Sequence, residues 1–233
     1  MTYRGYTLEQ IASHIDHSVL KPESSRAEIV RAAAVARQFK TASLCIRPMD
    51  VKLAVAELAG SGVPVCTVIG FPHGTSTTAA KVTETVEAVA SGCLEVDMVL
   101  NVSQLLDGFF AEVQADIRAV VEAAKEVNPD AIVKVIFETA LLNRDEIIKA
   151  CELSEAAGAD FVKTSTGFAS SGATIENVTL MKECVGDRLR VKASGGVRTV
   201  DQVIDFIEAG ASRCGASATE SILSVFTSKD PLD

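Results

Sequence analysis

Residues 131–168 read AIVKVIFETALLNRDEIIKACELSEAAGADFVKTSTGF. The run Ile132–Glu138 is rich in apolar and β-branched residues and predicts a buried strand. Asn143, with Glu146 three residues later, is typical of a helix start, and Gly158 is typical of a helix end. A second strand-like run follows at once. Strand, helix and strand in this order predict two parallel strands joined by a crossover helix.

The same alternation extends along the chain. The predicted strands are His14–His17, Ser43–Ile46, Val63–Ile69, Leu94–Leu100, Ile132–Glu138, Asp160–Lys163, Arg190–Ala193 and Arg213–Gly215. Between them, helical spacing of apolar residues is found at Val82, Val86 and Val89, at Leu105, Phe109, Val113, Ile117 and Val121, and at Val200, Val203, Ile204 and Ile207. Thr199 with Gln202 predicts a further helix start, and Gly92 and Gly210 further helix ends.

Eight such units favour an α/β fold of the closed (β/α)8 TIM barrel type. An open doubly wound sheet is the alternative, but it usually carries a GxGxxG turn after an early strand, and this sequence has none. No linker or low-complexity segment divides the chain. We therefore expect one barrel domain over residues 1–233.

Composition restricts the partners. The net charge of -9 and the pI near 4.9 argue against nucleic acid and anionic membranes. No apolar run approaches the roughly 20 residues that span a bilayer, and the first residues do not resemble a signal peptide. The six cysteines are scattered without a CxxC pair, which is typical of reduced thiols. We expect a cytoplasmic protein that binds a small molecule.

Polar side chains stand at the ends of the predicted strands. Asp97, Glu138, Lys163 and Lys192 all occupy such positions, and in a barrel this edge builds the active site. The alternative is that the two lysines reach solvent or pair with the carboxylates. Two lysines at neighbouring strand ends favour function, because buried ionisable groups gather at functional sites.

Two close ammonium groups disfavour each other's charged form, which predicts a lowered pKa for Lys163 beside Lys192. A neutral lysine amine attacks a carbonyl and forms a Schiff base. Asp97 is suited to move the proton that the resulting enamine needs. The expected chemistry is cleavage of a carbon–carbon bond without a metal or an organic cofactor.

Glycines follow the last two predicted strands. Gly195 and Gly196 come after Lys192, and Gly215 precedes Ser217. Loops after the seventh and eighth strands form the recurrent phosphate site of barrels, and glycine lets the backbone approach an anion closely. These loops predict a phosphorylated substrate.

The sequence resembles the deoxyribose-phosphate aldolases. The likeness rests on the segments IDHSVLKP (15–22), VIGFPHG (68–74), EVDMVLN (95–101), VKVIFET (133–139), GADFVKTSTGF (158–168), VKASGGVRT (191–199) and GASRCGAS (210–217). The resemblance implies cleavage of 2-deoxy-D-ribose 5-phosphate to D-glyceraldehyde 3-phosphate and acetaldehyde, in a homodimer. It implies Schiff-base chemistry at Lys163, with Lys192 and Asp97 as catalytic partners. The substrate-binding residues that it implies are Cys45, Thr164, Gly167, Gly195, Gly196, Gly215 and Ser217.

Other readings stay open from the residues alone. His14, Asp16 and His17 form an HxDH cluster that could hold a metal, but we favour no metal and expect Asp16 to orient polar groups or substrate hydroxyls at the mouth. Cys45 is expected to form a small apolar wall. Lys134 either pairs with Glu95 or supports the site from below.

A phosphosugar isomerase, or a phosphate-binding barrel without activity, is the alternative function. Some deoxyribose-phosphate aldolases also carry a C-terminal tyrosine near the site, whereas this chain ends SKDPLD and has tyrosines only at positions 3 and 6.

Overall fold

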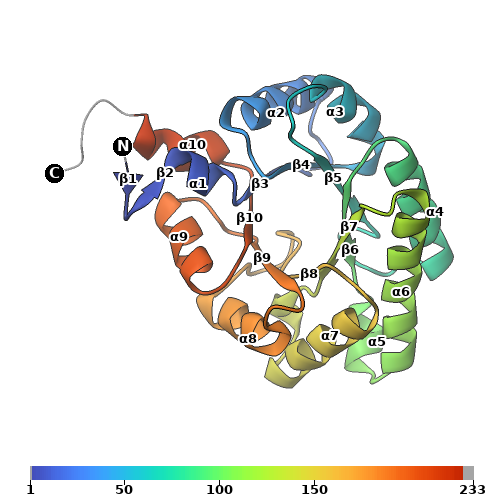
Figure 1. The fold of residues 1–233 in the computed structure, drawn as a ribbon. Coiled ribbons are helices and arrows are strands. Elements are labelled where there is room, and N and C mark those ends of the chain that lie inside the picture. The colour runs from blue at the N-terminus through green and yellow to red at the C-terminus, as the bar shows by residue number, and fades with distance from the viewer. Residues whose placement is uncertain (1, 228–233) are drawn as a thin grey trace.

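A computed structural model of the chain describes residues 2–227, and its centre is a closed barrel of parallel strands (Figure 1). The barrel strands follow the order β10-β3-β4-β5-β6-β7-β8-β9. Their bounds are β3 Ile15–Val19, β4 Ser43–Ile46, β5 Val65–Ile69, β6 Glu95–Val99, β7 Ile132–Ile136, β8 Phe161–Lys163, β9 Arg190–Ser194 and β10 Arg213–Ala216. The predicted (β/α)8 barrel and all eight predicted strands are therefore confirmed, and no strand end differs from its prediction by more than two residues.

Helices form an outer ring around the barrel (Figure 1). They are α1 Leu8–Ala12, α2 Arg26–Phe39, α3 Val51–Glu57, α4 Thr78–Ala90, α5 Val102–Leu106, α6 Phe110–Val127, α7 Arg144–Ala156, α8 Ile175–Val185, α9 Val200–Glu208 and α10 Thr219–Leu223. Short 3₁₀ helices, η1 Pro48–Asp50, η2 Thr139–Leu141 and η3 Ser224–Phe226, and an antiparallel ribbon, β1 Thr2–Tyr3 with β2 Tyr6–Thr7, complete the described chain. No helix of this part is long and apolar enough to cross a membrane.

The predicted helix starts are confirmed as capping boxes. The Asn143 side chain accepts from the backbone of Glu146, whose carboxylate accepts in return, and Thr199 pairs with Gln202 in the same way at α9. Satisfying the free N–H groups at a helix start stabilises it by about 1 kcal/mol. These caps fix where the crossover helices begin.

One predicted helix was wrong. The four-residue recurrence from Leu105 to Val121 spans two helices, because the chain turns at Gly108 with φ +79° between α5 and α6. Leu105 is buried on α5, whereas Phe109 precedes α6 and is 51% exposed. The periodicity continued by chance across the turn, and only packing reveals the break.

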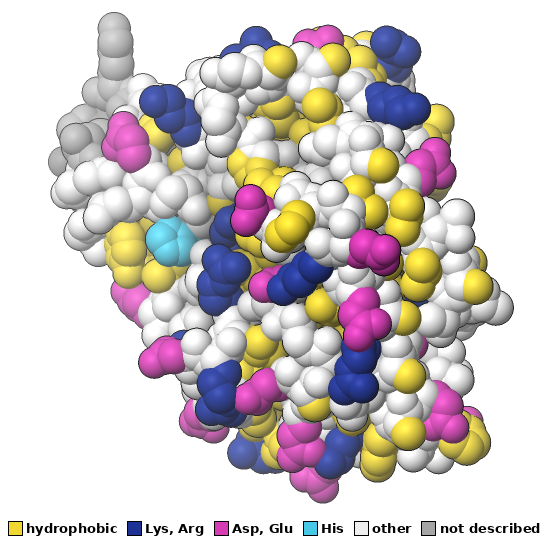
Figure 2. Space-filling model, turned by 45° about the vertical axis from the view of Figure 1, so that its right-hand side comes forward, with side chains coloured by type: hydrophobic (Ala, Val, Ile, Leu, Met, Phe, Trp, Pro, Cys, Tyr) yellow, Lys and Arg dark blue, Asp and Glu magenta, His cyan; other side chains and the backbone are white. Residues whose placement is uncertain are grey.

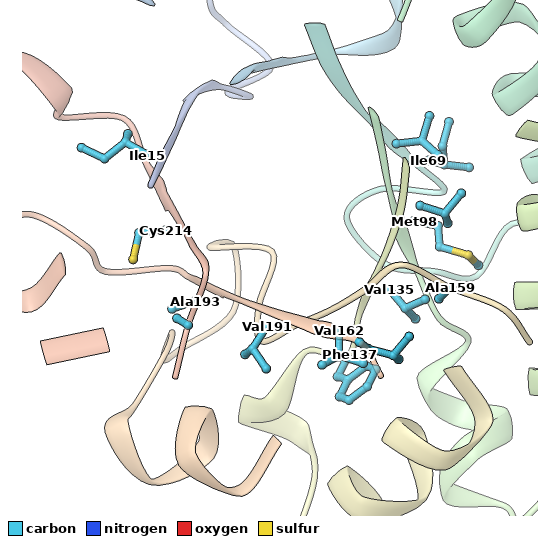
Figure 3. Packing of buried hydrophobic residues seen from close by; sticks show 14 of the residues in the cluster. Ile15, Ile69, Met98, Val135, Phe137, Ala159, Val162, Val191, Ala193 and Cys214 are labelled. Atoms are coloured by element: carbon cyan, nitrogen blue, oxygen red, sulfur yellow. The ribbon is translucent and has the colours of Figure 1, made fainter. Parts of the chain in front are cut away.

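Alternation along each strand separates two environments. Val133 and Val135 of β7 face outward and belong to the apolar core between strands and helices, where Figure 3 shows Val135 beside Met98 and Val162. Lys134 lies between them on the opposite face and points into the barrel. The apolar core is therefore the shell outside the barrel, which leaves the interior to polar side chains.

Helix α4 buries an ion pair in that shell. Lys81 is fully buried, and its Nζ lies 2.6 Å from Asp116 Oδ2 on α6 and 3.0 Å from the carbonyl oxygen of Val99. Thr78 donates a further hydrogen bond to the Asp116 carboxylate. By contrast Val86, predicted on the apolar face, is 40% exposed. Lys81 therefore lies on the buried face of α4, where the valine spacing predicted a hydrophobic residue.

Removing one partner of this pair should be costly. Asp116→Ala leaves the Lys81 ammonium buried without its carboxylate, and we expect a loss of about 3–5 kcal/mol in the free energy of unfolding. Urea denaturation followed by circular dichroism measures it. Asp187→Ala is the control, since the Asp187–Lys182 pair is exposed and its loss should change little. Equal losses of unfolding free energy in the two variants would contradict a buried ion pair between Lys81 and Asp116.

Candidate active site

Seven charged side chains meet inside the barrel, each from an inward position of a strand. They are Asp16 of β3, Glu95 and Asp97 of β6, Lys134 of β7, Lys163 of β8, Lys192 of β9 and Arg213 of β10. All but Arg213 are at most 3% exposed. We call this group the charged cluster. Such groups are buried only when they are paired, because desolvating an isolated charge is costly.

Asp97 is the centre of the cluster. Its Oδ2 accepts hydrogen bonds from Lys163 Nζ at 2.7 Å and from Lys192 Nζ at 2.8 Å. Its Oδ1 accepts from Lys134 Nζ at 2.8 Å and from the Cys66 thiol at 3.2 Å. The three residues predicted as catalytic are thus brought together around one carboxylate.

The carboxylate also changes the interpretation of the lysine pair. Lys163 and Lys192 are neighbours in register on β8 and β9, as two strand ends of a parallel sheet predict. The Asp97 oxygen that both contact offsets part of the repulsion between their ammonium groups. The lysines are therefore coupled through a shared anion as well as by like charge.

Lys134 and Arg213 form the rest of the cluster. Lys134 Nζ lies 2.6 Å from Glu95 Oε2, which confirms the predicted pairing, and it also contacts Asp97; its support of the site stays a prediction. The Arg213 guanidinium lies 2.6 Å from Asp16 Oδ1 and 3.4 Å from Glu95 Oε1. Arg213 was not predicted as a site residue. Its place two residues before Gly215, on the same strand face, is the signal that could have found it.

Asp16 does not lie at the mouth. It is fully buried, and its Oδ2 lies 2.5 Å from Lys192 Nζ while its Oδ1 faces Arg213. Its oxygens are thus engaged by two cations below the strand ends. The predicted position at the mouth was wrong, because Asp16 is the second residue of β3 and lies near the N-terminal end of that strand. A role of Asp16 toward substrate hydroxyls stays a prediction.

The mutual pairing fixes charge states. Burial alone would raise the pKa of Asp97, but the ammonium groups of Lys134, Lys163 and Lys192 outweigh it and hold the pKa well below its usual range. Burial alone would lower the pKa of Lys192, yet the carboxylates of Asp16 and Asp97 raise it above its usual value. Asp97 is therefore a carboxylate, and Lys192 a stable cation.

An aromatic ring closes the cluster from beneath. Phe161, fully buried on β8, has the Arg190 guanidinium at 4.0 Å from its ring centroid and Lys134 Nζ at 5.7 Å. Cations are attracted to the face of an aromatic ring. Phe161 thus separates the charged cluster from the N-terminal end of the barrel.

Cys45 and Cys66 form a wall on the β4–β5 side. With Val68 they make a small apolar cluster, packed by Leu20 and Phe71, which confirms the expected apolar wall at Cys45. A hydrogen bond with Cys66 lowers the pKa of the Cys45 thiol, whereas burial raises that of Cys66 well above its usual range. The two sulfurs and an Asp97 oxygen lie within 4.8 Å of one another, the one group of metal-ligand type among residues 2–227. The three ammonium groups on Asp97 make this a poor place for a cation.

Glycines bring the loops after β8 and β9 into contact. A Cβ atom on Gly172 would lie 2.1 Å from the carbonyl oxygen of Gly195, and one on Gly167 would lie 3.8 Å from the Gly195 Cα. Gly215 lies against Ser194 and the Lys192 stem. Gly196 has open space and, like Ser217, is exposed. The predicted phosphate residues thus line the C-terminal edge beside Lys192.

Thr164 has a different place from these residues. Its hydroxyl is fully buried, donates to the Ser194 carbonyl at 3.0 Å and accepts from the Ser194 N–H at 3.0 Å. These bonds join the ends of β8 and β9. The side chain therefore fixes the spacing of Lys163 and Lys192.

Glu138 holds the loop that follows Lys163. Its backbone has φ +58°, a left-handed conformation that is uncommon for residues other than glycine. Its carboxylate accepts from the hydroxyl and the N–H of Thr166. Such strain persists where the surroundings enforce it. Beside it, a cavity of about 150 Å³ opens at the mouth, lined by Pro72, His73, Val99, Val102, Glu138, Leu141, Thr166, Phe168 and Ala169.

The HxDH residues do not form a joint site. His14 Nδ1 lies 2.8 Å from the Gln10 carbonyl, and His17 Nδ1 lies 2.8 Å from the Thr219 hydroxyl, outside the barrel. Asp16 points the other way, into the charged cluster. The three side chains face different partners because neighbouring strand residues alternate between faces.

Fold and site together define a barrel enzyme whose reactive groups are buried lysines around a carboxylate. The family model of the DeoC/LacD family aldolases matches residues 11–223. The chain belongs to this family.

Similar proteins agree with that assignment. A deoxyribose-phosphate aldolase of Bacillus mycoides (strain KBAB4) is 55% identical over 213 residues, which are 91% of this chain and 94% of the relative. Deoxyribose-phosphate aldolase 2 of Staphylococcus aureus (strain MRSA252) is 55% identical over 212 residues, with the same coverage. The solved structure of deoxyribose phosphate aldolase from Aeropyrum pernix, described as a unique tetramer, has a TM-score of 0.88 at 29% identity and covers 95% of this chain and 93% of its own.

His17 should make stability depend on pH. Burial lowers its pKa to about 4. The unfolded chain takes up a proton there near pH 6.5, so this contribution is full above pH 6.5 and is lost as the pH falls toward 4. Between pH 7.5 and pH 5, the unfolding free energy of the wild type should fall by about 2 kcal/mol more than that of His17→Asn. Urea denaturation at both values measures the difference. Parallel losses would contradict a neutral His17.

Proposed function

We propose that this protein is a deoxyribose-phosphate aldolase, which reversibly cleaves 2-deoxy-D-ribose 5-phosphate to D-glyceraldehyde 3-phosphate and acetaldehyde. The observation that carries the proposal is the pair Lys163 and Lys192 on one oxygen of Asp97 at the C-terminal end of the barrel. The 55% identity to curated deoxyribose-phosphate aldolases supports the choice of substrate.

Lys163 is the proposed nucleophile. The neutral amine attacks the aldehyde carbon, water leaves, and a protonated Schiff base forms. This iminium accepts the electron pair of the bond between the second and third sugar carbons as that bond breaks. Glyceraldehyde 3-phosphate leaves, and an enamine stays on Lys163. Protonation of the second carbon and hydrolysis then release acetaldehyde.

Asp97 is the proposed proton relay. Its low pKa makes it a carboxylate at rest, so it begins as an acceptor. It takes the proton of the hydroxyl on the third carbon during cleavage and passes it to the enamine carbon. Lys192, kept charged by Asp16 and Asp97, favours each state in which Asp97 is ionised. Side chains supply every group in this sequence, so the proposal requires no metal or organic cofactor.

The phosphate is assigned to the loops at the same edge. Gly167, Gly195, Gly196 and Gly215 leave the backbone open, and Ser217 adds an exposed hydroxyl. Cys45 belongs to the apolar wall, and its sulfur lies within 4.8 Å of an Asp97 oxygen. Thr164 contributes to the site indirectly, because its hydrogen bond to Ser194 fixes the spacing of β8 and β9.

The remaining expectations stay predictions. They are a small-molecule phosphosugar and aldehydes as partners, no nucleic acid, one domain over residues 1–233, a homodimer and a cytoplasmic location. Basic and acidic side chains are interspersed over the face in Figure 2, which agrees with a small anion rather than a polyanion as the ligand. The C-terminal SKDPLD segment, residues 228–233, lies outside the described residues.

The covalent intermediate is the direct test. Incubation with substrate and borohydride should reduce the Schiff base to a stable amine on Lys163, located by peptide mass spectrometry. Lys163→Ala should lose the adduct and the turnover, and Lys192→Met should keep the adduct on Lys163 at a reduced rate. An adduct on Lys192 alone would reverse the roles of the two lysines. No adduct on any lysine would refute the mechanism.

A charge at Ser217 should act on phosphorylated substrates. Ser217→Glu places a carboxylate beside the proposed phosphate, and we expect KM for deoxyribose 5-phosphate to rise roughly tenfold or more, about 1.4 kcal/mol. Steady-state kinetics with deoxyribose as well should find little change for the unphosphorylated sugar. Ser13→Glu is the matched control, because it adds the same charge before β3 at the other end of the barrel. Equal effects on both sugars would place the phosphate elsewhere.

A further inference from the structure

Six of the buried charges form a closed ring of alternating sign. Arg213 contacts Asp16 at 2.6 Å, Asp16 contacts Lys192 at 2.5 Å, and Lys192 contacts Asp97 at 2.8 Å. The ring returns from Asp97 to Lys134 at 2.8 Å, to Glu95 at 2.6 Å and to Arg213 at 3.4 Å. Arg213 is the residue that closes it. A guanidinium suits this place, since its planar fork can reach two carboxylates at once.

Lys163 stands outside this balanced ring. Lys134, Lys192 and Arg213 supply three positive charges, and Asp16, Glu95 and Asp97 supply three negative ones. Within residues 2–227, the ion pair that Lys163 makes is with Asp97 alone, which already holds Lys134 and Lys192. Lys163 can therefore lose its proton without leaving a buried carboxylate unpaired. Loss of a proton from Lys134 or Lys192 would break the ring.

We infer that Arg213 and Glu95 are positioning residues, which set the pH at which Lys163 becomes a nucleophile by keeping the ring neutral. The inference rests on the proposed Schiff-base function and concerns what selects Lys163 for it. Neither residue needs to touch the substrate. Arg213 acts through Asp16 and Lys192, and Glu95 acts through Lys134, and both routes end on Asp97.

Other ionisable groups come from the strands and loops around Lys163. β6 contributes Asp97 and Glu95, and β7 contributes Lys134, with Glu138 in the loop after it. β9 and β10 contribute Lys192 and Arg213. β3 contributes Asp16, and β4 and β5 contribute the thiols of Cys45 and Cys66. The Cys66 thiol donates to Asp97 and stays protonated, because burial raises its pKa well above the usual range. The Cys45 thiol is the other group nearby that can titrate. The pH dependence must therefore be measured on the Lys163 amine as well as on kcat/KM.

Two substitutions of opposite charge provide the test. Arg213→Met leaves the ring with one net negative charge, which holds the Lys163 proton. Glu95→Gln leaves one net positive charge, which repels it. We expect the acid limb of kcat/KM to move up by about one pH unit in Arg213→Met and down by a similar amount in Glu95→Gln. The double variant is neutral again and should return toward the wild-type position.

The same shifts should occur in the amine itself. The rate of borohydride trapping of acetaldehyde on Lys163, followed by intact mass against pH, reports the lysine and not Cys45. Arg190→Met is the control, because Arg190 stacks on Phe161 and is outside the ring. It should leave the pH profile in place. Arg213→Lys keeps the charge and should hold the limb near its wild-type position.

The outcomes distinguish control of the Lys163 proton by the ring from a purely structural role of Arg213 and Glu95. Opposite shifts in the single variants, restored in the double variant, support the ring. Shifts of the same sign, or equal losses without any shift, mean that these residues only maintain structure, and they overturn the inference. No trapping in the wild type would refute the proposed function instead. If circular dichroism shows that Arg213→Met does not fold, Glu95→Gln and Arg213→Lys still test the inference. An acid limb of kcat/KM that does not move in Glu95→Gln overturns it.

Discussion

The rest of the site depends on the ion pairs that Asp97 makes inside the barrel. A carboxylate buried without partners would take up a proton rather than carry a charge. Here Lys134, Lys163 and Lys192 all contact Asp97 within 2.8 Å, and their attraction outweighs the cost of burial. Each lysine in turn is tolerated in the interior because this carboxylate is there. The proposed catalytic groups are consequently also the groups whose mutual pairing allows charges in the barrel interior.

The barrel makes this arrangement possible by separating two tasks. Outward side chains such as Val135 and Val162 pack against the helices and supply the apolar burial that stabilises the fold (Figure 3). Inward side chains at alternate positions are then free to be charged, provided that the charges balance. One residue such as Lys134 can therefore lie between two core valines and still take part in the site. Parallel register brings these inward positions from strands far apart in sequence to one level.

The edge above the cluster is built by different means. Gly172 and Gly195 approach so closely that a Cβ on either would clash, and Glu138 accepts a strained backbone to hold Thr166. The helices begin at fixed residues because side-chain caps satisfy their first N–H groups, as at Thr199 after the glycine loop. Backbone positions, more than side chains, therefore shape the space over Lys163. An anion can approach such a surface closely, which fits the proposed phosphate.

The sequence by itself determined the fold class, the eight strands and the choice of Lys163, Lys192 and Asp97 as candidate site residues, because strand alternation and strand-end polar residues are local patterns. It did not reveal the break at Gly108, since apolar spacing looks the same across a turn as within one helix. Tertiary structure alone decided that Asp16 lies in the interior and that Arg213 closes a ring with Glu95. Those contacts join residues up to 197 positions apart, and their distances follow from barrel closure and register. The sign of a charge can be read from the sequence, but its partner is set only when the strands meet.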